Sequence, residues 1–67
     1  MKNSLPEHRS RRGLSQQGLA ELLGVSRQAV ISLEKGRYDP SLPLAFKLAE
    51  VFECHIEDLF DPSENDL

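Results

Sequence analysis

The stretch from Leu14 to Gly36 constrains the fold more than any other part of the chain, because it has the pattern of two short helices joined by a tight turn. Ser15 can begin the first helix, since its hydroxyl can accept a hydrogen bond from a free backbone amide of the first turn. Gly24 can end that helix in the left-handed conformation, and Ser26 can cap the second. So short a connection does not allow an antiparallel pair, so we expect the steep crossing of a helix-turn-helix.

The second of these helices, predicted over residues 26–35, turns Val30 and Leu33 toward the core and leaves another face in solvent. The residues of that outer face are Arg27, Gln28, Ile31, Ser32 and Lys35. Arginine can pair with guanine through two hydrogen bonds, glutamine can do so with adenine, and an aliphatic group can contact the methyl of thymine. The face is therefore a candidate for reading the major groove of DNA.

The chain resembles the lambda-repressor-like helix-turn-helix family of small transcriptional regulators over about residues 2 to 60. The matching motifs are Gly13-Leu14-Ser15-Gln16, Leu19-Ala20, Gly24-Val25-Ser26-Arg27-Gln28, Leu33-Glu34-Lys35-Gly36 and Tyr38-Asp39-Pro40-Ser41-Leu42. The resemblance implies an all-α, compact five-helix fold with a helix-turn-helix. It also implies a sequence-specific DNA-binding transcriptional regulator, which we expect to be a repressor.

The resemblance further implies how residues 26–35 meet DNA, with the N-terminus of the helix entering the major groove first. We expect Arg27 and Gln28 to contact base edges, and Ile31 and Ser32 to complete the reading surface. The residues expected to hold backbone phosphates are Gln16, Ser26, Lys35 and Arg37. For Gln16, the alternative is a solvated side chain in the first turn of its helix.

A structural ion pair between Arg9 and Glu34 is also implied by the resemblance. We expect the pair to be largely buried and to tie the first helix to the helix of residues 26–35, so that removing one partner would cost roughly 3–5 kcal/mol. The alternative is a solvent-exposed pair, which contributes only about 0–1 kcal/mol.

The remaining helices are expected on either side of the motif. Ser4 and Glu7 have the spacing of a capping box, which predicts a first helix from about Leu5 to Arg12. Ser41 can cap a later helix, and Glu53 follows it at a place where the family often has glycine in a positive-φ conformation. A last short helix is expected to include Ile56, Leu59 and Phe60.

Net charge is unevenly divided along these 67 residues. Residues 1–38 hold seven Lys and Arg against three Asp and Glu, and residues 39–67 hold one against eight, giving +4 and -7 for a total of -3. We expect the acidic half to weaken non-specific binding to DNA. We assign a DNA-binding domain to residues 1–61 and an acidic flexible tail to residues 62–67.

Other function classes find little support in the sequence. There is no nucleophile-base pair, phosphate-binding glycine loop or metal-ligand spacing, and Cys54 is the single cysteine, so we expect no enzyme activity, cofactor, metal or disulfide. Neither a signal peptide nor a membrane span is seen, which predicts a soluble cytoplasmic protein.

The partner we expect is double-stranded DNA with a near-palindromic operator, bound by a homodimer, because one such domain contacts too few bases for useful specificity. Candidates for the dimer surface are Phe46, Val51 and Phe60. The alternative is an antitoxin or protein-interaction adaptor that uses the same fold through its acidic half.

Overall fold

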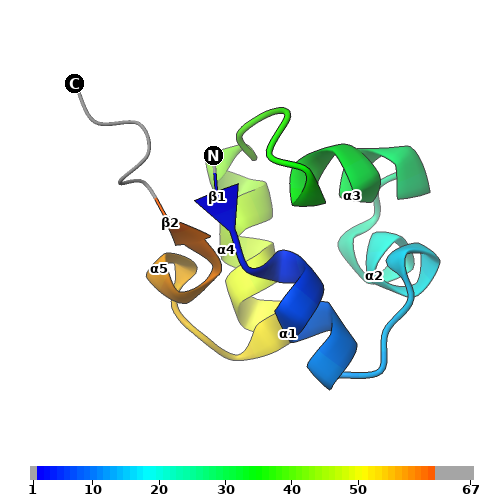
Figure 1. Ribbon diagram of the computed structural model, residues 1–67, viewed down its shortest axis with the longest axis horizontal. Coiled ribbons are helices and arrows are strands. Elements are labelled where there is room, and N and C mark those ends of the chain that lie inside the picture. Colours follow the sequence, from blue (N-terminus) through cyan, green and yellow to red (C-terminus); the bar gives the residue numbers. More distant parts are fainter. Residues whose placement is uncertain (1, 62–67) are drawn as a thin grey trace.

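The computed structural model describes residues 2–61, in which five helices surround a small core and the two ends of the described chain pair as short strands (Figure 1). The elements are β1 (Lys2–Asn3), α1 (Leu5–Arg11), α2 (Gln16–Leu23), α3 (Arg27–Glu34), α4 (Leu42–Phe52), α5 (Ile56–Leu59) and β2 (Phe60–Asp61). The predicted five-helix domain is confirmed. The predicted acidic tail, residues 62–67, lies outside the described residues.

The long helix α4 runs through the middle of the molecule, with α2 and α3 on one side and α5 and the strands on the other (Figure 1). Leu48 and Phe52 of α4 belong to a hydrophobic core to which all five helices contribute side chains. The largest fully buried side chains of this core are Leu5, Leu19, Val30, Leu48 and Leu59. Within residues 2–61, no helix is long and apolar enough to cross a membrane.

Serine caps begin α2, α3 and α4 where the sequence predicts them. Ser15, Ser26 and Ser41 each accept, through the hydroxyl oxygen, a hydrogen bond from the backbone N–H three residues later, at 2.9, 3.1 and 3.3 Å. Gly24 ends α2 in the left-handed region, with φ 73° and ψ 30°. These predictions are confirmed, and together they leave only Gly24, Val25 and Ser26 between α2 and α3.

The predicted capping box at Ser4 and Glu7 is wrong. The first amide of α1, that of Leu5, donates instead to Asn3 Oδ1 at 3.0 Å, while Ser4 Oγ donates to the carbonyl oxygen of Asp58 at 2.9 Å. The reason is the pairing of β1 with β2, which holds Lys2 and Asn3 in an extended conformation and brings Ser4 beside Asp58 and Leu59. In addition, α1 ends at Arg11, one residue earlier than expected.

The two-stranded sheet is the element that the sequence did not predict. Asn3 pairs with Phe60 and Lys2 with Asp61 in antiparallel register, so Phe60 belongs to β2 and not to the last helix. Its side chain is 6% exposed and lies in the core. Phe60 is therefore wrong as a dimer-surface candidate, because folding already uses its apolar area.

Candidate nucleic-acid interface

The outer face of α3, defined by Arg27, Gln28, Ile31, Ser32 and Lys35, lies on a helix whose opposite face is locked into the core. Val30 and Leu33 on that opposite face are 0% and 2% exposed. On the outer face Ile31 and Ser32 are half-buried, and the other three residues are exposed. Among residues 2–61 the side chains of Arg27 and Gln28 have no hydrogen-bond or ion-pair partner, so both can bind a ligand without breaking an internal contact.

An open groove lies beside the N-terminal end of this face. It is lined by Arg9, Ser15, Gln16, Gln17 and Arg27, and so brings the beginning of α2 next to the beginning of α3. The guanidinium of Arg27 and the free amides of two helix N-termini favour a negative charge in this groove, whereas the guanidinium of Arg9 is paired with Glu34. A phosphate group is the kind of anion that such a groove can hold.

A network of charged and polar side chains connects α1 and α2 to the last residue of α3. Arg9 Nε donates to Glu34 Oε2 at 2.7 Å and Arg9 Nη2 donates to Glu34 Oε1 at 3.3 Å. Gln16 Nε2 donates to the same Oε1 at 3.1 Å, and Arg9 Nη1 donates to the carbonyl oxygen of Leu14 at 3.0 Å. The side chain of Glu34 is 6% exposed and that of Arg9 is 20% exposed, so the ion pair is largely enclosed.

Gln16 therefore has a partner that sequence reasoning missed. Its bond to Glu34 uses one N–H of the side-chain amide, and among the described residues the second N–H and the amide oxygen have no partner. Gln16 also lines the groove at the beginning of α2. The internal bond thus orients the amide while leaving it able to donate to an anion in that groove.

At the other end of α3, exposed Lys35 and Arg37 extend from a turn that closes back on the helix. The backbone N–H of Arg37 donates to the carbonyl oxygen of Ser32 at 3.0 Å. Tyr38 holds the following loop in place, because its hydroxyl donates to the carbonyl oxygen of Ala29 at 3.3 Å. These bonds fix the backbone from which the two cations extend.

Asn3 is a second residue that contacts α3 and that sequence reasoning missed. Its side-chain Nδ2 donates to the carbonyl oxygens of Leu33 and Glu34, at 3.1 and 3.4 Å. These partners lie thirty or more residues further along the chain, so no local pattern could have revealed the contact. A segment outside the helix-turn-helix therefore touches the end of α3.

Cys54 lies away from α3, in the segment between α4 and α5. Burial raises the pKa of the Cys54 thiol, nearby Asp58 raises that pKa further, and Arg12 opposes the shift. A thiol with a raised pKa has little thiolate near neutral pH, so it is a poor nucleophile. Within residues 2–61, His, Cys, Asp and Glu side chains form no group of three that could hold a metal ion.

Comparisons with known proteins point to the same part of the chain. Residues 7–59 match the helix-turn-helix family model. An HTH-type transcriptional regulator of Methanocaldococcus jannaschii is 57% identical over 60 residues, covering 90% of this chain and 91% of the relative. The HTH-type transcriptional regulator YgzD of Bacillus subtilis is 50% identical over 60 residues, covering 90% and 91%.

A solved structure extends this likeness from sequence to fold. The restriction-modification controller protein C.AhdI of Aeromonas hydrophila superposes with a TM-score of 0.74 and 39% identity, over 84% of this chain and 85% of that one. The overlap includes most of the described residues, so the arrangement of helices around α3 is shared and is not peculiar to this chain.

Proposed function

The chain belongs to the helix-turn-helix family of DNA-binding transcriptional regulators, and on that premise we propose that it reads a specific DNA sequence by placing α3 in the major groove. The observation that carries the proposal is the state of Arg27 and Gln28. Both lie in the first turn of α3, both are exposed, and neither has an internal partner among residues 2–61. Long polar side chains in that state match the donors and acceptors of base edges.

Other residues complete the proposed interface. Ile31 and Ser32 are half-buried on the next turn of α3 and would contact the bases that follow those read by Arg27 and Gln28. The groups proposed to hold backbone phosphates are Gln16 and Ser26 at one end of α3, and Lys35 and Arg37 at the other. Phosphate contacts at both ends of a helix set its depth and register, while the base contacts between them give the sequence preference.

We propose that two copies bind together. One domain of this size contacts few base pairs, and a two-fold dimer on a near-palindromic operator, with half-sites about 34 Å apart, doubles the contacts. Leu42 and Phe46, one turn apart on α4, are 65% and 59% exposed and are the candidates for the contact between copies. A dimer occupying an operator within a promoter blocks transcription directly, so we propose a repressor.

The test is selection of DNA from a random duplex pool by the purified protein, followed by anisotropy titrations on the retained sequence. We expect a near-palindromic motif. Arg27→Ala and Gln28→Ala should each reduce discrimination at one base position by about 1–3 kcal/mol, roughly 5- to 150-fold, without lowering the melting temperature. The matched control is Arg11→Ala, which removes an exposed arginine from α1 and should leave the base preference unchanged.

Two results would contradict the proposal. One is a folded protein that retains no motif even at low salt, and the other is an Arg27→Ala variant with unaltered base preference. Either result would favour the antitoxin or adaptor alternative, in which the acidic half of the chain, with Glu50, Glu53 and Glu57 exposed, contacts a protein partner.

A further inference from the structure

The side chain of Asn3 joins the beginning of one helix to the end of another. Its Oδ1 accepts a hydrogen bond from the first amide of α1, that of Leu5, at 3.0 Å. Its Nδ2 donates to the carbonyl oxygens of Leu33 and Glu34, the last two residues of α3. The carbonyl of Leu33 already accepts from the backbone N–H of Gly36 at 3.0 Å, so Asn3 adds a second donor there. It also gives a donor to the carbonyl of Glu34 in the last turn of the helix, where carbonyls lack partners within the helix.

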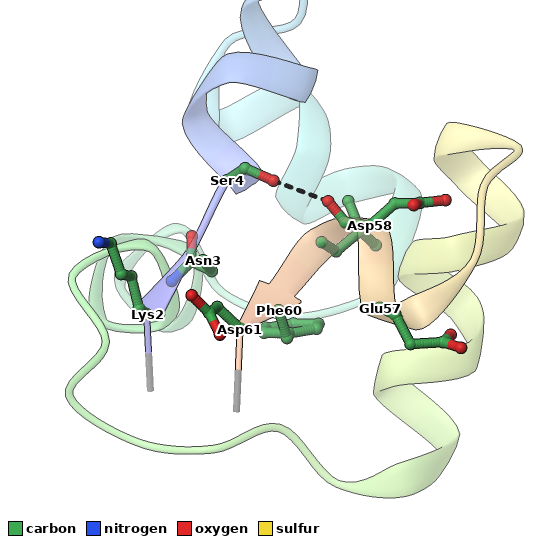
Figure 2. Close-up of a pocket in the computed structure, with 8 residues that line it drawn as sticks. Lys2, Asn3, Ser4, Glu57, Asp58, Phe60 and Asp61 are labelled. Atoms are coloured by element: carbon green, nitrogen blue, oxygen red, sulfur yellow. Dashed lines mark hydrogen bonds between the residues drawn. The ribbon is translucent and has the colours of Figure 1, made fainter. Parts of the chain in front are cut away.

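The backbone around Asn3 is held by contacts of its own. Asn3 pairs with Phe60 across the sheet, and Phe60 is anchored in the core at 6% exposure. The next residue, Ser4, donates its backbone N–H to the carbonyl oxygen of Leu59 at 2.8 Å and its hydroxyl to that of Asp58 at 2.9 Å. Figure 2 shows Asn3 on β1 beside β2, and the hydrogen bond that joins Ser4 to Asp58. These contacts therefore hold the side-chain amide of Asn3 in a fixed position.

The end of α3 that Asn3 holds is also the end that carries two cations. Lys35 follows the helix directly, and the backbone N–H of Arg37 donates to Ser32 within its last turn. A tilt of this end would move both cations relative to a DNA backbone. The Arg9–Glu34 pair holds the same end through a side chain, which can change rotamer, whereas Asn3 holds the backbone itself.

We propose that Asn3 is a positioning residue for DNA binding. It fixes the position of the C-terminal end of α3 relative to the DNA backbone, so that Lys35 and Arg37 contact phosphates. This inference rests on the proposed function. Asn3 does not itself contact DNA in this arrangement. The pairing of β1 with β2 contributes to this role, because it fixes the backbone of Asn3 against Phe60.

Asn3→Asp is the variant that separates the two roles of the side chain. Aspartate keeps the oxygen that accepts from Leu5, and a negative charge is favourable at the N-terminus of α1. It lacks the donor for Leu33 and Glu34, and it brings a negative oxygen toward their carbonyls. A residue that only caps α1 would therefore tolerate the change, whereas a residue that holds α3 would not.

We expect Asn3→Asp to weaken operator binding by about tenfold at temperatures where the protein stays folded. The slope of log affinity against log salt should become shallower by about 2 in a dimer, because each lost phosphate contact of a cation removes about 0.9 and one such contact is lost from each copy. The matched control is Lys2→Gln, which changes the net charge by the same unit in β1. Lys2→Gln therefore measures how one unit of net charge changes the affinity and the salt slope while the Asn3 side chain is kept.

A readout without DNA keeps the inference testable on its own. The amides of Gly36 and Arg37 donate to Leu33 and Ser32, so their hydrogen exchange reports on the end of α3. We expect both to exchange faster in Asn3→Asp, while the amides of α2 keep their protection. Unchanged protection at Gly36 and Arg37, or weaker binding with the salt slope of the wild type, would overturn the role of Asn3. Wild-type protein without operator preference would instead overturn the proposed function.

Discussion

At the scale of single residues, Glu34 is the carboxylate that links α1 and α2 to the end of α3. It accepts from Arg9 twice and from Gln16 once, and its side chain is 6% exposed. Removing one member of an enclosed ion pair leaves the other without its counter-charge, at a cost that exceeds what an exposed pair contributes. The structure thus has the enclosed form of the pair, as expected from the sequence.

Glu34→Gln tests this assignment. We expect a loss of about 3 kcal/mol, at the low end for an enclosed pair, because Arg9 is 20% exposed and can be partly hydrated. For a domain of this size the melting temperature should fall by roughly 10–25 °C, measured by circular dichroism. The matched control is Glu21→Gln, since the carboxylate of Glu21 accepts from Gln17 at 3.2 Å but is exposed. A melting temperature as little changed as that of the control would show that the pair contributes nothing.

At the scale of elements, α4 ends in a strained residue. Glu53 has φ 53° and ψ 48°, the left-handed conformation that the sequence predicts for this position, and it is the one non-glycine residue with positive φ in the described chain. An L-residue with a Cβ pays a steric penalty there that glycine does not.

Glu53→Gly should accordingly raise the free energy of unfolding by about 0.5–1 kcal/mol, after the greater entropy of glycine in the unfolded chain is subtracted. Denaturant titration measures the change. Glu53 also lies 3.7 Å from Arg12, but both side chains are exposed, so losing this contact should cost little. Glu53→Ala is the control, because it loses the same carboxylate and keeps the strain. Equal stabilisation by alanine would rule out backbone strain as the cause.

The elements also show what a sequence can and cannot predict in a fold of this kind. The caps at Ser15, Ser26 and Ser41 are predictable because each joins a side chain to an amide three residues away. The exposure of Arg27 and Gln28 follows from helical spacing for the same local reason. The positions of Asn3 and Phe60 depend on two ends of the chain meeting, and no periodicity encodes a pairing of two-residue strands.

At the scale of the whole molecule, most basic residues lie in the elements up to the loop after α3, and most acidic residues lie in α4 and beyond. Seven of the eight Lys and Arg residues precede residue 39, in β1 and the segment from α1 to the loop after α3, and Lys47 is the eighth. Most of the acidic residues belong to α4, α5 and the segments after them. Three of the cations, Arg27, Lys35 and Arg37, lie on α3 or just after it, so the proposed attraction to DNA is strongest there, and the acidic residues should repel a duplex that approaches α4 and α5.

The salt dependence of operator binding tests this picture and the dimer together. Lys35 and Arg37 supply two cation–phosphate contacts in each copy, so a dimer should show a slope of log affinity against log salt of about -4, and a single copy about -2. Lys35→Ala should make the slope shallower by about 2 in a dimer, because one substitution removes a contact from both copies, but by about 1 in a monomer. Lys47→Ala is the control, since it removes a cation from the acidic half. If that variant changed the slope as much as Lys35→Ala, the contacts would not be confined to the α3 side, and the proposed orientation on DNA would be wrong.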